Sequence, residues 1–252
     1  MTNFTGKTSN EARAGLSPQE RRGLCFHEAG HAVVKALGGA RVYRVAVAPV
    51  GSEDGAWFHE SRKGKRVDEV WGFCEAAGSP ADSCIRFDPA SGDYGVDQTL
   101  FSQVQRGWRD TTVRRRSSTE MYRQIRLHLC AALAGSLAEQ IHRGGDVWLD
   151  DEADWCDWND VKVAACYARL LRQRGELERL HAETVRVLQL KEVWPFVERL
   201  ANALDLTGCL NFDDDSEGLL PAPLLDWPPT PRGEEARLRA SIRVPLTTGG
   251  AA

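Results

Sequence analysis

Apolar side chains that recur every four residues mark the clearest helix of the sequence. The pattern begins near Ser118 and ends at Gly144-Gly145, and its apolar positions are Met121, Ile125, Leu129, Leu133, Leu137 and Ile141. This spacing places them on one face of a helix. Between Leu133 and Leu137 lie three small residues, Ala134-Gly135-Ser136. We therefore predict a long amphipathic helix with a patch where another backbone can approach closely.

A second helix is framed by start and stop signals. Ser17-Pro18-Gln19-Glu20 forms a capping box with proline at the first helical position, and Gly38-Gly39 follows the stretch LCFHEAGHAVVKAL. Beyond it, residues 42–47 alternate between apolar and polar side chains, and Ala56-Trp57-Phe58 could return as a partner strand. The pattern predicts a helix followed by a small hairpin.

The second half of the chain carries further helical patterns. One runs from about Trp158 to Arg174, with Asp157 as its cap and Gly175 as its stop. Two more occupy about 176–206, where Pro195 starts or kinks the second and Gly208 ends it. We therefore expect an α+β fold that is mainly α-helical, with a small β-hairpin or sheet.

The remaining segments suit a single domain with appendages. Residues 60–117 have short apolar stretches among Gly, Pro and Asp, so we predict a loop-rich insertion. Six of the eleven prolines follow residue 220, which is typical of an extended or disordered tail. The predicted organisation is an N-terminal arm over 1–16, one domain over 17–210 and a tail over 211–252.

Composition narrows the function classes. The 252 residues are 42% hydrophobic and carry a net charge of -4, which gives no overall attraction to nucleic acid or an anionic membrane. The sequence contains no signal-peptide core and no apolar run of the roughly 18 residues that a spanning helix needs. Seven cysteines without a C-x-x-C pair favour reduced thiols. We therefore expect a soluble, cytoplasmic protein.

The motif with the clearest chemistry lies inside the first predicted helix. His27-Glu28-Ala29-Gly30-His31 reads H-E-x-x-H, and this composition would produce about 0.01 such motifs by chance. Residues four apart lie one turn apart on one helix face, so both imidazoles can bind one zinc ion. Glu28 can then take a proton from a zinc-bound water, whose pKa falls to about 7. The spacing predicts a catalytic zinc site.

Such a site needs a third protein ligand. The other four histidines each stand alone in the sequence: His59, His128, His142 and His181. Among the acids, Asp160 is expected in the first turn of its helix, in line with Ala164, Ala168 and Leu171. It is either a ligand or a residue that complements the helix dipole, and the residues alone do not decide between the two.

Four stretches in the same order resemble the peptidase domain of the FtsH family, the membrane-anchored AAA+ zinc proteases. They are HEAGHAVV, GSEDGAWF, ALAGSLAEQI and NDVKVAACYAR, within roughly residues 18–58 and 119–206. The resemblance implies that His27, His31 and Asp160 bind one zinc ion and that Glu28 is the catalytic base. It also implies a substrate-binding edge strand at Gly55, Ala56, Trp57 and Phe58. Glu139 is then either a partner of a ligand histidine or part of a plain salt bridge, and Asn159 is a second candidate partner.

The sequence also departs from that family. Gly6-Lys7-Thr8 lacks the earlier glycine of a phosphate-binding loop, so ATP dependence is not expected to transfer. The resemblance to FtsH implies an endopeptidase that hydrolyses polypeptides, either alone or with a separate ATPase as unfoldase, and it also implies a homo-oligomer.

The alternative is a catalytically silent, metal-stabilised binding module. Its partner would contact the basic residues of the insertion, Arg62, Lys63, Lys65, Arg66, Arg114, Arg115 and Arg116. Nucleic acid is disfavoured as that partner because no aromatic residues that could stack bases are interleaved with these charges.

Overall fold

The computed structural model describes residues 15–52, 58–61, 66–68, 71–110, 118–144, 155–171, 173–212, 218–224 and 227–229. The helices are α1 (Pro18–Leu37), α2 (Gln98–Asp110), α3 (Ser118–Arg143), α4 (Trp155–Leu170), α5 (Glu176–Leu188) and α6 (Trp194–Thr207). The strands are β1 (Val42–Val47), β2 (Phe58–Glu60), β3 (Arg66–Asp68), β4 (Gly72–Ala76), β5 (Ile85–Asp88), β6 (Asp93–Val96) and β7 (Cys209–Asn211). The prediction of a mainly helical α+β fold with small sheets is confirmed.

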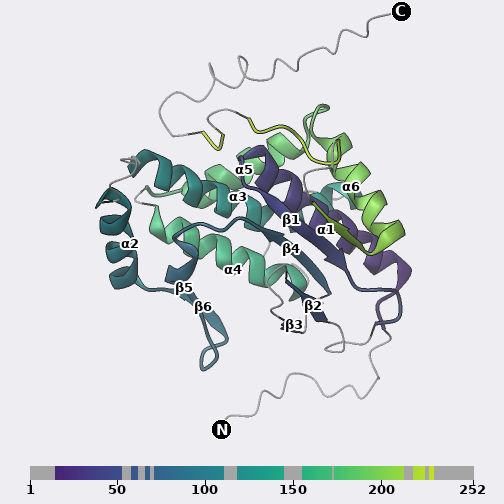
Figure 1. Ribbon diagram of the computed structural model, residues 1–252, viewed down its shortest axis with the longest axis horizontal. Helices are drawn as coiled ribbons and strands as arrows, with labels where there is room; N and C mark the ends of the chain where they lie inside the picture. Colours follow the sequence, from purple (N-terminus) through teal and green to yellow (C-terminus); the bar gives the residue numbers. More distant parts are fainter. Residues whose placement is uncertain are drawn as a thin grey trace, which may run out of the picture.

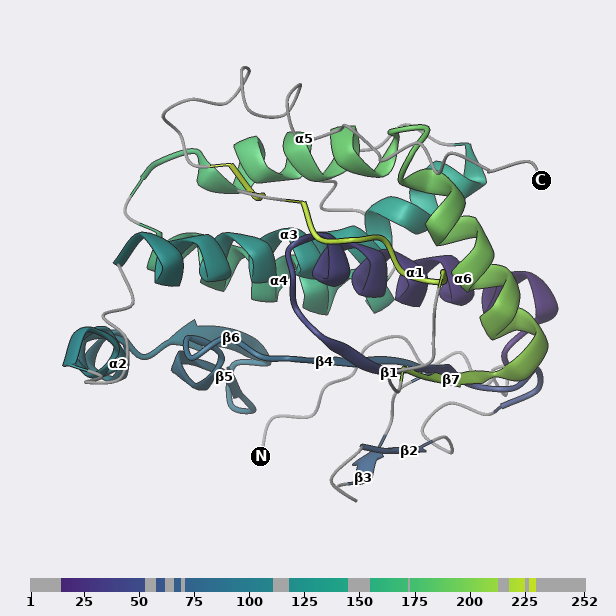
Figure 2. The same ribbon diagram turned by 45° about the horizontal axis from the view of Figure 1, so that its top comes forward.

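The helices and the main sheet form layers. Figure 2 shows α5 on one side of α1, α3 and α4, and the sheet of β1, β4 and β7 on the other. Helix α3 packs against α1, α4 and α5, while α1 also contacts β1 and β4. Helices α2 and α6 lie at opposite ends of the molecule (Figure 1). Helix α1 therefore lies in the interior, between α3 and the sheet.

The predicted start and stop signals of α1 are present. The Ser17 hydroxyl accepts a hydrogen bond from the backbone N–H of Glu20, and the Glu20 carboxylate accepts one from the backbone N–H of Ser17. At the other end Gly39, with φ of 80°, takes the left-handed conformation, whereas the cap residue Gly38 does not. The capping box fixes where the helix starts, and so fixes the direction in which the H-E-x-x-H face points.

Small residues allow α1 and α3 to approach closely. A Cβ added to Gly30 would lie 2.7 Å from the Cβ of Ala138 and 3.0 Å from the carbonyl carbon of Ala134. Such distances are too short for carbon atoms, so only glycine fits at this position of α1. The close approach predicted at Ala134-Gly135-Ser136 is confirmed, and the neighbour is the motif helix itself.

The main sheet has the order β4-β1-β7, and both pairings are antiparallel. The predicted hairpin between 42–47 and 56–58 is wrong at its described end, because Phe58 pairs with Asp68 of β3 and β1 pairs with β4 instead. Gly55, Ala56 and Trp57 lie outside the described residues. The alternation of β1 predicted a strand correctly, but it carries no information on which later strand pairs with it.

The segment 60–117 is not loop-rich in its described part. It contains β4, which belongs to the main sheet, the β5–β6 hairpin and helix α2, whose first turn is capped by the Asp97 carboxylate. Ala81, Cys84 and Trp108 are buried in the same core as α1. The elements are short and each contributes few apolar side chains, so the sequence pattern is weak although the packing is continuous.

The described part of the predicted tail packs on the rest of the fold, and the boundary predicted at residue 210 falls inside β7. Strand β7 ends at Asn211, and Trp227 is only 2% exposed. The indole N–H of Trp227 donates to Glu183 Oε1 at 3.0 Å, and the Leu224 N–H donates to the Leu37 carbonyl at 2.8 Å. Residues 218–224 and 227–229 therefore pack on the helices, while 230–252 lie outside the described residues.

The N-terminal arm ends earlier than residue 16. Leu16 is buried, its N–H donates to the Ser52 carbonyl, and its carbonyl accepts from the N–H of Gly51. Residues 1–14 lie outside the described part of the chain. None of the helices described is long and apolar enough to cross a membrane.

Candidate metal centre

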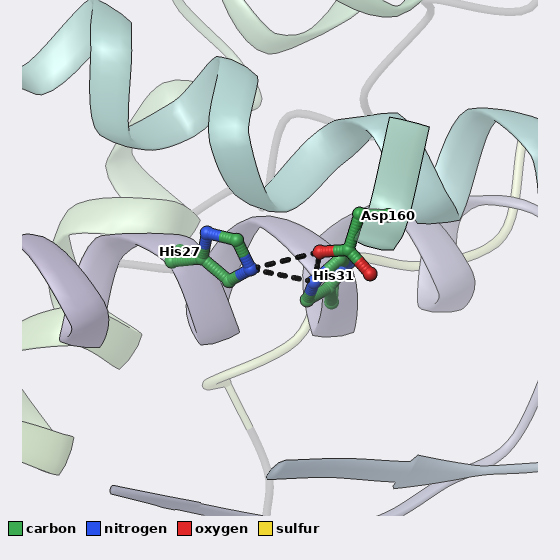
Figure 3. A group of neighbouring side chains, drawn as sticks. All are labelled: His27, His31 and Asp160. Atoms are coloured by element: carbon green, nitrogen blue, oxygen red, sulfur yellow. Dashed lines mark hydrogen bonds and ion pairs between the residues drawn. The ribbon is translucent and has the colours of Figure 1, made fainter. Parts of the chain in front are cut away.

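Three predicted ligands from two helices meet at one point. His27 and His31 project from successive turns of α1, and Asp160 reaches them from α4 (Figure 3). The Nε2 atom of His27 lies 3.0 Å from Asp160 Oδ2 and 3.0 Å from Nε2 of His31, which itself lies 3.2 Å from Asp160 Oδ2. The structure thus brings together residues that are 133 positions apart in the sequence.

Helix α4 begins earlier than predicted, and this changes the meaning of Asp160. The helix starts at Trp155 rather than near Trp158, so Asp160 lies in its second turn. Interaction with the helix dipole falls off within the first turn, which weakens the alternative role of Asp160 as a simple dipole partner. Its side chain is 29% exposed and faces both imidazoles.

The partners of the two histidines determine which nitrogen carries the proton. His31 Nδ1 lies 2.6 Å from the carbonyl oxygen of Ala131, which can only accept, so Nδ1 is the donor. His27 Nδ1 lies 3.6 Å from the Glu139 carboxylate, within ion-pair distance, and the negative charge there favours the proton on Nδ1. Both Nε2 atoms then present a lone pair toward Asp160 Oδ2. Three acceptors facing one another at 3.0 to 3.2 Å are stable only around a cation.

The donor set and spacing fit zinc. Tetrahedral zinc with bonds of about 2.0–2.2 Å holds its ligand atoms about 3.3–3.6 Å apart, slightly wider than the distances in this cluster. Two imidazoles and one carboxylate are common protein ligands of a zinc site that keeps its fourth position open. His27, His31 and Asp160 could therefore hold one zinc ion after small side-chain adjustments.

Without a metal, a proton fills the same role. Burial alone would lower the pKa of His27, but hydrogen bonds with Asp160 and Glu139 raise that pKa well above its ordinary value. Burial would raise the pKa of Asp160, but the His31 charge and hydrogen bonds from both imidazoles hold it well below its usual range. Because a metal needs these groups deprotonated, metal and proton compete for one cluster.

Glu28, the predicted base, lies in the interior beside the start of β4. Glu28 is only 5% exposed. Burial raises the pKa of its carboxyl group, although the imidazoles of His27 and His31 oppose the shift. A Cβ added to Gly72 would lie 2.8 Å from the Glu28 carboxyl carbon. Gly72 falls in the segment predicted to be loop-rich, so its place in a strand beside the motif could not be found from the sequence pattern.

A second glycine adjoins the candidate metal ligands. A Cβ added to Gly135 of α3 would lie 2.5 Å from His31 Nε2 and 2.6 Å from His27 Nε2. The sequence identified Gly135 as part of a packing patch, but its missing side chain also leaves room for the two ligand atoms. This role could not be found without knowing which face of α3 meets the motif.

Glu139 combines both roles predicted as alternatives. Its Oε2 faces His27 Nδ1, and its Oε1 forms an ion pair with Arg143. Asn159, next to Asp160 on α4, is exposed. Of the two candidate partner residues, the structure brings Glu139 to the cluster.

Three of the remaining histidines have other neighbours in the described structure. His128 faces Asp82 at 3.6 Å, and Asp82 also accepts a hydrogen bond from the Tyr167 hydroxyl at 2.7 Å. His142 stacks on Phe26 with ring centroids 3.6 Å apart. His181 is half-buried on α5, and nothing is described of the His59 side chain. The cluster of possible metal ligands found among the described residues is His27, His31 and Asp160.

No protein-family model matches this sequence, and no curated protein sequence matches it either.

Proposed function

We propose that this protein is a zinc-dependent metalloendopeptidase. The observation that carries the proposal is the convergence of three possible ligand atoms from His27, His31 and Asp160, in a helix that also carries the buried carboxylate of Glu28. The H-E-x-x-H spacing and the resemblance to FtsH peptidase domains support the same assignment. His27, His31 and Asp160 would hold one zinc ion.

Glu28 acts as the general base. A zinc ion, when bound, supplies Lewis-acid chemistry that polarises a carbonyl and acidifies water. Glu28 removes a proton from the attacking water and then passes it to the nitrogen of the leaving amine, so that one carboxylate serves both halves of the reaction. Burial raises its pKa, and a more basic carboxylate accepts the proton of water more readily.

The edge of β4 is the proposed binding site for the polypeptide substrate. Strand β4 is at the edge of the order β4-β1-β7 in the described sheet, and its first residue, Gly72, adjoins Glu28. An extended peptide can add to such an edge through backbone hydrogen bonds. The edge predicted at 55–58 stays a prediction, because Gly55, Ala56 and Trp57 lie outside the described residues and only the pairing of Phe58 with Asp68 is described.

The resemblance to FtsH peptidases and the cysteines also suggest the partners and the cellular location of the protein. We propose an unfolded polypeptide as substrate, a separate ATPase for folded substrates and a homo-oligomer, each by resemblance to FtsH peptidases. The cysteines whose side chains are described carry no disulfide, namely Cys25, Cys74, Cys84, Cys130, Cys166 and Cys209. Free thiols fit a reducing compartment, which supports a cytoplasmic location.

The test compares wild type with Glu28→Gln, which keeps the size of the side chain and removes its basicity. We expect zinc-loaded wild type to cleave unfolded casein and Glu28→Gln to lose at least about 100-fold of that rate, with one zinc ion still bound. Glu178→Gln, at an exposed position of α5, is the control and should cleave like wild type. Equal cleavage by Glu28→Gln would contradict the role of Glu28. Zinc binding without any cleavage by wild type would favour the silent binding module.

A further inference from the structure

Glu139 links the candidate metal centre to the protein surface. One of its carboxylate oxygens faces His27 Nδ1 at 3.6 Å, and the other forms an ion pair with Arg143, one turn further along α3. Exposure rises along this path, because the side chain of His27 is 8% exposed, that of Glu139 is 14% and that of Arg143 is 57%. A surface cation is thus connected to a candidate metal ligand through one partly buried carboxylate.

A glycine of α1 makes room for this connection. A Cβ added to Gly23 would lie 2.6 Å from Glu139 Oε1 and 3.3 Å from the Arg143 guanidinium. Gly23 lies inside α1, four residues before His27, where glycine destabilises a helix by about 1 kcal/mol relative to alanine. The absent side chain allows the ion pair of Glu139 and Arg143 to lie against the motif helix.

We infer that Arg143 is a positioning residue of the metal centre, which acts through Glu139 to fix the orientation and the protonated nitrogen of His27. A carboxylate that accepts from the outer nitrogen of a metal-ligating histidine directs the other nitrogen toward the metal. Arg143 holds that carboxylate in place and balances its charge, since Asp160 already contributes one negative charge to the cluster. The inference rests on one part of the proposed function, namely that His27, His31 and Asp160 bind a divalent metal, and it does not require peptide hydrolysis.

The experiment measures Zn²⁺ affinity of the full chain by competition with a chromophoric chelator, in four variants. Removal of a residue that supports a ligand typically weakens metal binding 10- to 100-fold, so we expect about a 10-fold loss in Arg143→Ala. Arg143→Lys keeps the charge and should recover to within about threefold of wild type. Gly23→Ala keeps both charges but displaces Glu139 Oε1, and should also weaken binding. Arg186→Ala is the control: Arg186 is an exposed arginine that forms an ion pair with Glu183 on α5. This variant should bind zinc like wild type.

The thermal unfolding of the metal-free variants separates positioning from folding. We expect Arg143→Ala to unfold within about 2 °C of wild type, because an exposed ion pair contributes at most about 1 kcal/mol. Unchanged zinc affinity in Arg143→Ala would overturn this inference alone and leave the proposed function in place. An equal loss of affinity in Arg186→Ala would overturn it too. If wild type binds no zinc, the proposed function fails together with the inference.

Discussion

The carboxylate of Glu28 lies directly against the backbone of Gly72, the first residue of β4. This contact joins the motif helix to the edge strand of the main sheet, so the proposed base and the proposed substrate-binding edge are adjacent. Gly72 has no side chain, and β4 can therefore approach α1 this closely. Any side chain at position 72 would overlap the carboxylate.

Gly72→Ala should therefore impair peptide hydrolysis without removing the metal. The added methyl group would displace Glu28, and we expect kcat/KM for casein to fall at least about 10-fold because small displacements of a catalytic group are costly. Zinc content should stay at one ion per chain. Gly95→Ala is the matched control, since a Cβ there meets nothing within 4 Å. Wild-type activity in Gly72→Ala would contradict the assigned position of Glu28.

Gly135→Ala should act on the metal ligands instead. A methyl group at this position overlaps both Nε2 atoms, so the imidazoles must rotate away from each other. We expect Zn²⁺ affinity to fall at least about 10-fold, as measured by chelator competition. Gly107→Ala on α2 has open space around its Cβ and should bind zinc like wild type. The prediction is wrong if both variants retain full affinity.

Asp160→Asn tests the third ligand. The amide keeps the shape of the side chain but loses the negative charge, and an amide oxygen is a much weaker zinc ligand than a carboxylate. We expect at least a roughly 100-fold loss of Zn²⁺ affinity by calorimetric titration. Asp93→Asn, an exposed change on the β5–β6 hairpin, is the control. Equal affinity in the two variants would move the third ligand elsewhere.

His128 gives the metal-free protein a pH dependence of its own. Burial lowers its pKa from the ordinary value of 6.5, although the nearby Asp82 carboxylate opposes this. The imidazole of the unfolded chain therefore binds a proton at a higher pH than that of the folded chain. Protonation stabilises the unfolded chain, so the free energy of unfolding decreases as pH falls below about 6.5. With chelator present, the Tm of wild type should fall more between pH 7 and pH 5 than the Tm of His128→Gln does. Parallel curves for the two proteins would contradict the prediction.

Trp227→Ala tests the packing of the C-terminal segment. The indole is buried and hydrogen-bonded to Glu183, so its removal leaves a cavity and should lower the free energy of unfolding by about 3–5 kcal/mol. Urea unfolding measures the change. A loss below about 1 kcal/mol would mean that the segment contributes little to the fold.

What the sequence predicted well is local. His27 and His31 are four residues apart on one capped helix, so their convergence follows from helix geometry alone. The periodicity of α3, the proline near the start of α6 and the glycine at its end are local signals as well, and both helices lie where they were predicted. Patterns within one element need no knowledge of the rest of the chain.

What the sequence missed depends on contacts between distant segments. Asp160 became a favoured ligand only through the resemblance to a family, because the packing of α4 on α3 decides where its carboxylate lies. Gly72 looked like a loop residue because the pairing of β4 with β1 is set by tertiary packing and not by local alternation. Trp227 lies in a proline-rich stretch, and the composition of that stretch gives no sign that Trp227 is buried against the helices.

The central claim is that His27, His31 and Asp160 bind zinc. The most direct measurement is an anomalous-difference map from crystals of the zinc-loaded protein, recorded on both sides of the zinc absorption edge. The account predicts one peak about 2.0–2.2 Å from both Nε2 atoms and from an Asp160 carboxylate oxygen. A peak at other residues, or no peak at this cluster, would contradict it.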